Sequence, residues 1–136
     1  MTQIHADGGK FLGRALKRND SLIDLNLRLN RLSDEGGRML FEGLRHNSSV
    51  TSLNVSSNAL DGEATKALVV CVASPDSGLV TVDLSGNRLQ EPDVDVLKDA
   101  LQENASLTAL DLRSNPVCSG AGLLRGLCVC TCDTQL

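Results

Sequence analysis

The sequence predicts an α/β solenoid, a right-handed coil of strand–helix units with a parallel sheet on its concave side and helices on its convex side. Two observations predict this fold. A leucine-rich string begins at residues 22, 50, 79 and 107, so the intervals are 28, 29 and 28 residues. Aromatic residues make up only 1% of the chain, which suits a stack of thin layers filled by Leu and Val.

The repeated string fits the pattern L-x-x-L-x-L-x-x-N-x-L when Val is accepted in place of Leu. Its four copies are LIDLNLRLNRL, VTSLNVSSNAL, LVTVDLSGNRL and LTALDLRSNPV. Residues before the first copy match the second half of the later repeats, with Leu12 in the position of Leu40. We therefore assign residues 1–117 to the array, with a half repeat at 1–21 and repeats starting at 22, 50, 79 and 107. Because the array starts inside a repeat, we expect a piece of a larger array or assembly.

The first half of each repeat is expected to be a short strand. Side chains alternate along a strand, so Leu25 and Leu27 are expected to point inward and Asn26 outward. The same pattern predicts further inward pairs at Leu53/Val55, Val82/Leu84 and Leu110/Leu112. Each strand is followed by an asparagine whose amide can donate and accept hydrogen bonds. We expect these amides to form a ladder through the stack: Asn30, Asn58, Asn87 and Asn115.

The second half of each repeat is expected to be an amphipathic helix. Apolar residues spaced i, i+4 define its buried face, namely Leu40/Leu44, Leu68/Val72 and Leu97/Leu101, widened by Met39, Ala67 and Val96. A column of small residues is expected to let the helices lie close to the sheet: Ala15, Gly43, Cys71 and Ala100. The helices are expected to end at Asn19, Asn47 and Asn104.

Charge and hydropathy exclude several classes of function. The net charge of −4 provides no basic stripe for nucleic acid. No apolar run reaches the roughly 18 residues that a membrane span needs, and the first ten residues lack the apolar core of a secretory signal. We therefore expect a reducing, cytoplasmic environment in which the cysteines are thiols.

The 28/29-residue period with L-x-x-L-x-L-x-x-N-x-L-x-x-x-G resembles the ribonuclease-inhibitor class of leucine-rich repeats. This class includes ribonuclease inhibitors, sensor domains of NOD-like receptors and Ran GTPase-activating proteins. The resemblance implies binding to proteins, mostly through the concave face and its adjoining loops. Within this class, SLIDLNLRLNRLSDEGGRML at residues 21–40 is similar to the leucine-rich-repeat subunit of the axonemal nexin–dynein regulatory complex. That similarity implies a structural subunit of motile cilia, with axonemal dynein regulatory subunits as partners.

Outward-facing strand positions form three predicted columns that provide a polar, partly acidic surface for a basic partner segment. The alternative is that these positions are polar only because they face solvent and bind no partner. The columns lack Tyr and Trp, which anchor many tight interfaces, so modest affinity is expected. The candidate partner-binding residues are Asp24, Asn26, Arg28, Ser52, Asn54, Ser56, Thr81, Asp83, Ser85, Asp111 and Arg113, with Ala109 completing the first column.

A second candidate surface lies on the expected convex side. Phe41 and Val69 occupy equivalent positions in adjacent repeats, and Val70 follows directly. These residues are candidates for an apolar docking patch. The favoured alternative is partial burial between neighbouring helices, which would remove Phe41 from the surface.

The segment 118–136 departs from the repeat pattern. A terminal cap of the array is a simpler interpretation of this segment than a metal site. Cys128, Cys130 and Cys132 have C-x-C-x-C spacing, and thiolates can bind zinc or copper. However, the segment has no C-x-x-C pair and no neighbouring His, so we predict neither a metal site nor a cofactor.

The sequence predicts a non-catalytic protein-interaction module or scaffold. Asp83 and Asp111 are expected side by side on adjacent strands, but an open concave surface gives such a pair no pocket for catalysis. The leading setting is the ciliary axoneme, where the chain would help to regulate dynein. The alternative is a regulator of an enzyme or small GTPase, as the Ran activators are.

Overall fold

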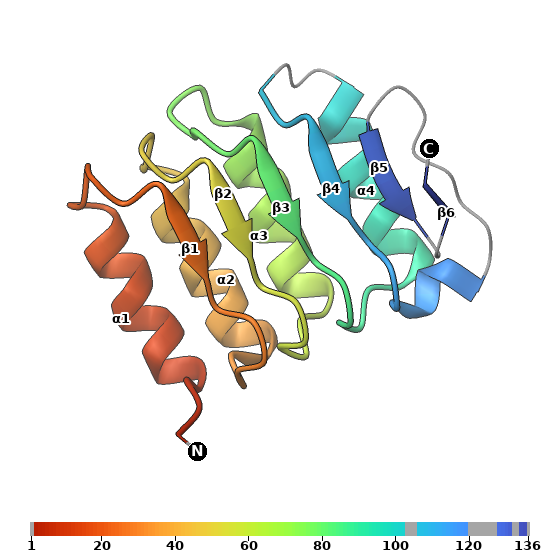
Figure 1. Ribbon diagram of the computed structural model, residues 1–136, viewed down its shortest axis with the longest axis horizontal. Coiled ribbons are helices and arrows are strands. Elements are labelled where there is room, and N and C mark those ends of the chain that lie inside the picture. The colour runs from red at the N-terminus through yellow and green to blue at the C-terminus, as the bar shows by residue number, and fades with distance from the viewer. Residues whose placement is uncertain (1, 103–105, 120–127, 132–133, 136) are drawn as a thin grey trace.

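The computed structural model describes residues 2–102, 106–119, 128–131 and 134–135, with side chains through residue 117. Strands and helices alternate in a single curved stack, with the sheet on one side and the helices behind it (Figure 1). The predicted α/β solenoid is confirmed. Its helices are α1 (Ala6–Leu16), α2 (Ser33–Leu44), α3 (Gly62–Ala73) and α4 (Glu91–Gln102), followed by the 3₁₀ turn η1 (Pro116–Ser119).

The sheet follows the order of the chain, β1-β2-β3-β4-β5-β6. Strands β1 to β5 pair in parallel, and β6 runs antiparallel to β5. The repeat predicts β1 to β4, whereas the two strands in the degenerate segment were not predicted. Their bounds are β1 (Asp24–Asn26), β2 (Ser52–Asn54), β3 (Thr81–Asp83), β4 (Ala109–Asp111), β5 (Cys128–Thr131) and β6 (Thr134–Gln135).

One continuous hydrophobic core fills the space between the sheet and the helices. The inward strand positions Leu53, Val82 and Leu110 are each 3% exposed or less, as predicted from their alternation. The i, i+4 pairs of the helices are buried as well. Val96 is the exception, since 48% of its surface is exposed. It was expected to widen the buried face of α4 and instead lies on the solvent side of the helix.

Strand β1 is one edge of the described sheet, and the residues around it are less buried than their equivalents in later repeats. Leu22 is 37% exposed, while Val50, at the same repeat position, is completely buried. Leu25 is half-buried for the same reason. Ile23 and Leu29 are also exposed. The residues at the start of this repeat are therefore exposed because no strand precedes β1 in the described sheet.

The predicted asparagine ladder is confirmed. Asn58 donates through Nδ2 to the carbonyl of Leu27 in the preceding layer, at 2.8 Å. Its backbone N–H donates to Oδ1 of Asn87 in the following layer, at 3.0 Å, and that oxygen also accepts from Leu60 N–H. Asn115 repeats these bonds one layer further on. The amides thus satisfy buried backbone groups that the turns leave without partners.

Replacing Asn87 by alanine is expected to destabilise the chain by about 1–3 kcal/mol, because it leaves buried donors and acceptors unsatisfied. Urea denaturation followed by circular dichroism measures this change. Asn26→Ala is the matched control, since Asn26 is exposed and accepts a bond only from Arg28 N–H among the side-chain bonds described for it. If the two variants had the same urea concentration at the midpoint of unfolding, the structural role of the asparagine ladder would be contradicted.

A left-handed backbone conformation recurs immediately before each ladder asparagine and was not predicted. The residues at this position have φ between 54° and 67°: Leu29, Ser57, Gly86 and Ser114. Only glycine adopts this region without steric cost, and only one of the four is glycine. The hydrogen bonds of the following asparagine hold the turn in this conformation at each layer.

A further asparagine, Asn47, lies three residues beyond the end of α2. It donates to the carbonyls of Leu16 and Asn19 in the preceding layer and accepts from Val50 N–H. Asn19 likewise accepts from the backbone of the next residues. The helices were expected to end at these asparagines but end three residues earlier, at Leu16 and Leu44, while Asn104 lies outside the described residues.

Asp34, in the first turn of α2, caps the neighbouring helix α3. Its Oδ1 accepts from the N–H groups of Asp61 and Ala64 at 3.0 and 2.8 Å, and its Oδ2 accepts from Glu63 N–H at 3.1 Å. A carboxylate at a helix N-terminus satisfies free donors and interacts favourably with the helix dipole. The layers are therefore joined on their helical side by a side-chain cap as well as by apolar packing.

Gly43 was predicted, with the other small helix residues, to let the helices lie close to the sheet, but it has a different neighbour. A Cβ atom added there would collide with the backbone of Gly13 in α1, so this glycine faces the neighbouring helix rather than the sheet. Gly9 and Gly36 form a second close approach, because a Cβ on Gly9 would lie 2.6 Å from the Gly36 carbonyl oxygen. Helices α1 and α2 therefore touch through their backbones.

Candidate functional site

The concave strand face holds the predicted columns in the expected register. Asp24, Ser52, Thr81 and Ala109 are paired across adjacent strands, as are Asn26, Asn54, Asp83 and Asp111. Period-two alternation places both columns on the solvent side, because the residue between them is the buried one. The parallel register, which the constant repeat length sets, therefore assembles these side chains from positions far apart in the sequence.

The third column is only partly exposed. Arg28 and Arg113 are exposed and Ser85 is half-buried. Ser56, however, is only 4% exposed, so the expectation that it belongs to the accessible surface is wrong. Its hydroxyl donates to Asn54 Oδ1 at 2.7 Å as the chain turns after β2, and this bond holds the side chain against the turn.

Strands β2, β3 and β4 line a hollow of about 280 Å³ on the concave side. Ser52, Thr81 and Ala109 provide one row of its lining, and Asn54, Asp83 and Asp111 provide the other. Small and medium side chains form both rows, so the curvature of the sheet is not filled by bulky groups. The hollow therefore runs across the strands, from β2 through β3 to β4, between the two rows.

The polar row of this hollow is organised by local hydrogen bonds. Asp83 Oδ1 accepts from the backbone N–H and the hydroxyl of Ser85, at 2.9 and 2.6 Å. Asp111 accepts from Arg113, which forms an ion pair with it at 2.7 Å. Among the described residues no cationic group lies within 4 Å of the Asp83 carboxylate. The negative charge of the hollow is therefore least compensated at Asp83, near its centre.

The candidate convex patch does not include Phe41, which is completely buried, in line with the favoured alternative of burial between neighbouring helices. Phe41 lies one helical turn after Gly37, and a Cβ on Gly37 would press against Leu60 and Ala64. The shared face of residues 37 and 41 therefore packs toward the next layer and not toward solvent. Val69 is half-buried and Val70 is 48% exposed, so the apolar surface at this position is reduced to the two valines.

Cys71 is a free, buried thiol in α3. Burial raises its pKa from 9.0 to about 11, while the Ser77 hydroxyl and Arg45 act in the opposite direction. The thiol is therefore protonated at neutral pH and a poor nucleophile. The side chains of Cys118, Cys128, Cys130 and Cys132 lie outside the described residues, so the prediction that they bind no metal stays a prediction. The described part of the chain holds no cluster of metal-binding side chains.

Within the described residues, no helix is both long and apolar enough to cross a membrane. The roles of the concave residues in binding, and the absence of catalysis, remain predictions. What the geometry provides is a polar surface whose side chains are aligned across adjacent strands of one sheet.

The stacked layers, the parallel register of the strands and the asparagine ladder define the chain as a leucine-rich-repeat solenoid. A family model described as "Leucine Rich repeat" matches residues 18–41, 46–69 and 103–119. These matches confirm the repeat itself, whereas assignment to the ribonuclease-inhibitor class stays a prediction. A comparison with curated protein sequences gives no significant match.

Among solved structures, the chain is similar to leiomodin-1 actin-binding site 2, with a TM-score of 0.71 and 18% sequence identity. The similarity covers 77% of this chain and 61% of that chain. The chain thus matches less than two thirds of the leiomodin structure. At this identity the likeness shows the fold alone.

Proposed function

We propose that this chain is a non-catalytic protein-interaction module whose concave face binds a basic segment of a protein partner. The observation that carries the proposal is the hollow over β2, β3 and β4, with Asp83 near its centre. A carboxylate without a cationic neighbour attracts Lys or Arg side chains, and desolvation between the two surfaces strengthens that attraction. The polar rows on either side provide further hydrogen-bonding groups.

The form of the surface favours an extended segment over a compact pocket ligand. The hollow crosses three strands and is lined by short side chains, so a chain lying across the strands can contact both rows at once. Tyr and Trp are absent from the whole sequence, and these residues supply many of the strongest anchors at interfaces. The affinity is therefore expected to be modest.

We propose the cytoskeleton, and specifically the ciliary axoneme, as the setting, with axonemal dynein regulatory subunits as partners. The similarity of residues 21–40 to the subunit of the nexin–dynein regulatory complex supports this setting. The shared fold with an actin-binding site of leiomodin-1 supports a cytoskeletal role more generally. Cytoplasmic localisation belongs to the same proposal.

A capture experiment from an extract of ciliated cells tests both parts of the proposal. The bait carrying Asp83→Lys and Asp111→Lys is expected to lose the partner that the parent chain retains. The matched control carries Asp95→Lys and Asp99→Lys, which change the net charge equally on exposed positions of α4. Circular dichroism must show that both variants are folded.

The outcomes separate the binding face from the cellular setting. Loss of the partner with both double variants, or with neither, would contradict the concave face as the binding surface. Loss with the concave variant alone supports it. Recovery of dynein regulatory subunits supports the axoneme, whereas recovery of actin or of a small GTPase would overturn that setting and leave the concave proposal standing.

A further inference from the structure

We propose that a groove on the convex side, running from α1 across α2 to α3, binds an acidic peptide segment of a second protein. The groove consists of two adjoining hollows of about 340 and 180 Å³, which share Lys17 and Glu42 in their linings. The helices that line it, α1, α2 and α3, lie behind the sheet (Figure 1). This surface is separate from the concave face and independent of its proposed role.

The backbone contact between α1 and α2 forms the floor of the smaller hollow. Gly13 and Gly43 line the smaller hollow, and neither can carry a Cβ without colliding with the facing helix. With no side chain at these two positions, the surface between the helices is recessed. The longer side chains on either side form the walls.

The walls are predominantly basic, although the chain as a whole has a net charge of −4. Lys10 and Arg14 of α1 and its C-cap residue Lys17, which keeps helical backbone angles, are spaced at i, i+4 and i+7, so they lie along one face of the helix. Arg45 and His46, just after α2, extend this row into the larger hollow. Within the described part of the chain, no carboxylate lies within 4 Å of the side-chain nitrogens of these residues.

Glu42 is the acidic residue of the groove, and its charge is already compensated. Its Oε1 accepts from Arg38 Nη1 at 2.7 Å, an i, i+4 ion pair along α2. An incoming carboxylate would therefore encounter the free charges of α1 and of the end of α2. Charge complementarity assigns the groove to an acidic occupant.

Apolar groups border the basic row and indicate a peptide rather than a free anion. Met39 lines the smaller hollow, and Ala67 and Val70 line the larger one. Val70 is 48% exposed, and its burial under an apolar side chain of the occupant would be favourable. A flat bilayer cannot enter a recess between two helices, so the geometry favours a protein segment over an anionic membrane.

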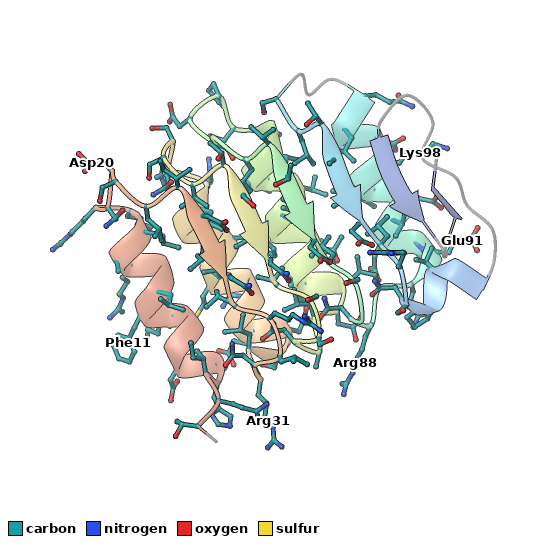
Figure 2. The ribbon with its side chains drawn as sticks, in the orientation of Figure 1. Phe11, Asp20, Arg31, Arg88, Glu91 and Lys98 are labelled. Carbon is teal, nitrogen blue, oxygen red and sulfur yellow. The ribbon has the colours of Figure 1, made fainter. Side chains whose placement is uncertain are left out.

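Fluorescence anisotropy with a labelled peptide of repeated Glu-Glu-Leu units tests this inference. The double variant Arg14→Glu with Lys17→Glu is expected to bind the peptide about tenfold more weakly than the parent chain, or worse. The matched control is Arg31→Glu with Arg88→Glu, which changes the net charge equally. Arg31 and Arg88 project from the turns after β1 and β3, at the lower edge of the molecule (Figure 2).

The position of binding is read from the amide resonances of Gly13 and Gly43, which are expected to shift on addition of the peptide. Equal weakening by both double variants would overturn the proposal, because it would show general attraction to charge. Unchanged binding by the groove variant, or no binding by the parent, would overturn it too. So would selective binding of phosphatidylserine vesicles in place of the peptide, since the occupant would then be a membrane surface.

Discussion

Phe41→Asp is expected to unfold the chain. Phe41 is completely buried, and deleting a buried phenylalanine side chain alone costs about 3–5 kcal/mol. The aspartate would also be buried without a partner, which adds a further penalty. A domain of this size is stable by about 5–15 kcal/mol. We therefore expect the variant to lose its helical circular dichroism signal at room temperature, or to unfold at very low urea.

Phe11→Asp makes the same substitution at an exposed site and serves as its control. Phe11 is 63% exposed and projects from α1 at the outer edge of the stack (Figure 2). Surface changes of this kind usually alter stability by less than about 1 kcal/mol. A folded Phe41→Asp variant as stable as Phe11→Asp would contradict the packing of Phe41 between layers and would restore it as a surface residue.

Leu84→Ala has the second largest expected effect, a loss of about 2–5 kcal/mol in the free energy of unfolding. Leu84 follows β3 directly, points into the core and is 2% exposed. Layers pack against it on both sides, so the cavity cannot close without moving a neighbouring repeat. Because each layer relies on its neighbours, the loss is expected to lower the stability of the whole stack.

Urea denaturation measures this loss, with Leu29→Ala as control. Leu29 carries the same side chain but is 58% exposed and lies in a turn. Its truncation is expected to cost less than about 1 kcal/mol. A loss below about 1 kcal/mol for Leu84→Ala would mean that this residue does not face the core.

The fold was predictable because each repeat encodes its layer with few types of residue. Strand alternation determines that Leu53 and Val55 are buried, and the asparagine after each strand determines where its turn is stabilised. The constant period then sets the register between strands, so the repeat alone is enough to align the concave columns. The exposed positions in these columns follow from the same alternation, which explains why most of the candidate residues lie on the concave surface as expected.

The remaining features depend on packing between layers, which the repeat pattern does not specify. Phe41 and Lys98 share a repeat position, yet the phenylalanine is buried and the lysine exposed. Asp34 caps a helix that begins a full repeat later, at Gly62, so no local capping motif marks it. The smaller convex hollow depends on Gly13 and Gly43. These glycines occupy different repeat positions, so the repeat alignment does not predict that their backbones meet.

Photo-crosslinking from the centre of the concave face tests the central claim most directly. A benzophenone amino acid at Thr81, beside Asp83 in the hollow, would be compared with the same group at Val96, exposed on α4. The chain would be mixed with the partner captured from ciliated cells. We expect crosslinks from Thr81 alone, to a segment of the partner rich in Lys and Arg. Crosslinks from Val96 alone, or from Thr81 to an acidic segment, would contradict a concave surface that recognises a basic partner.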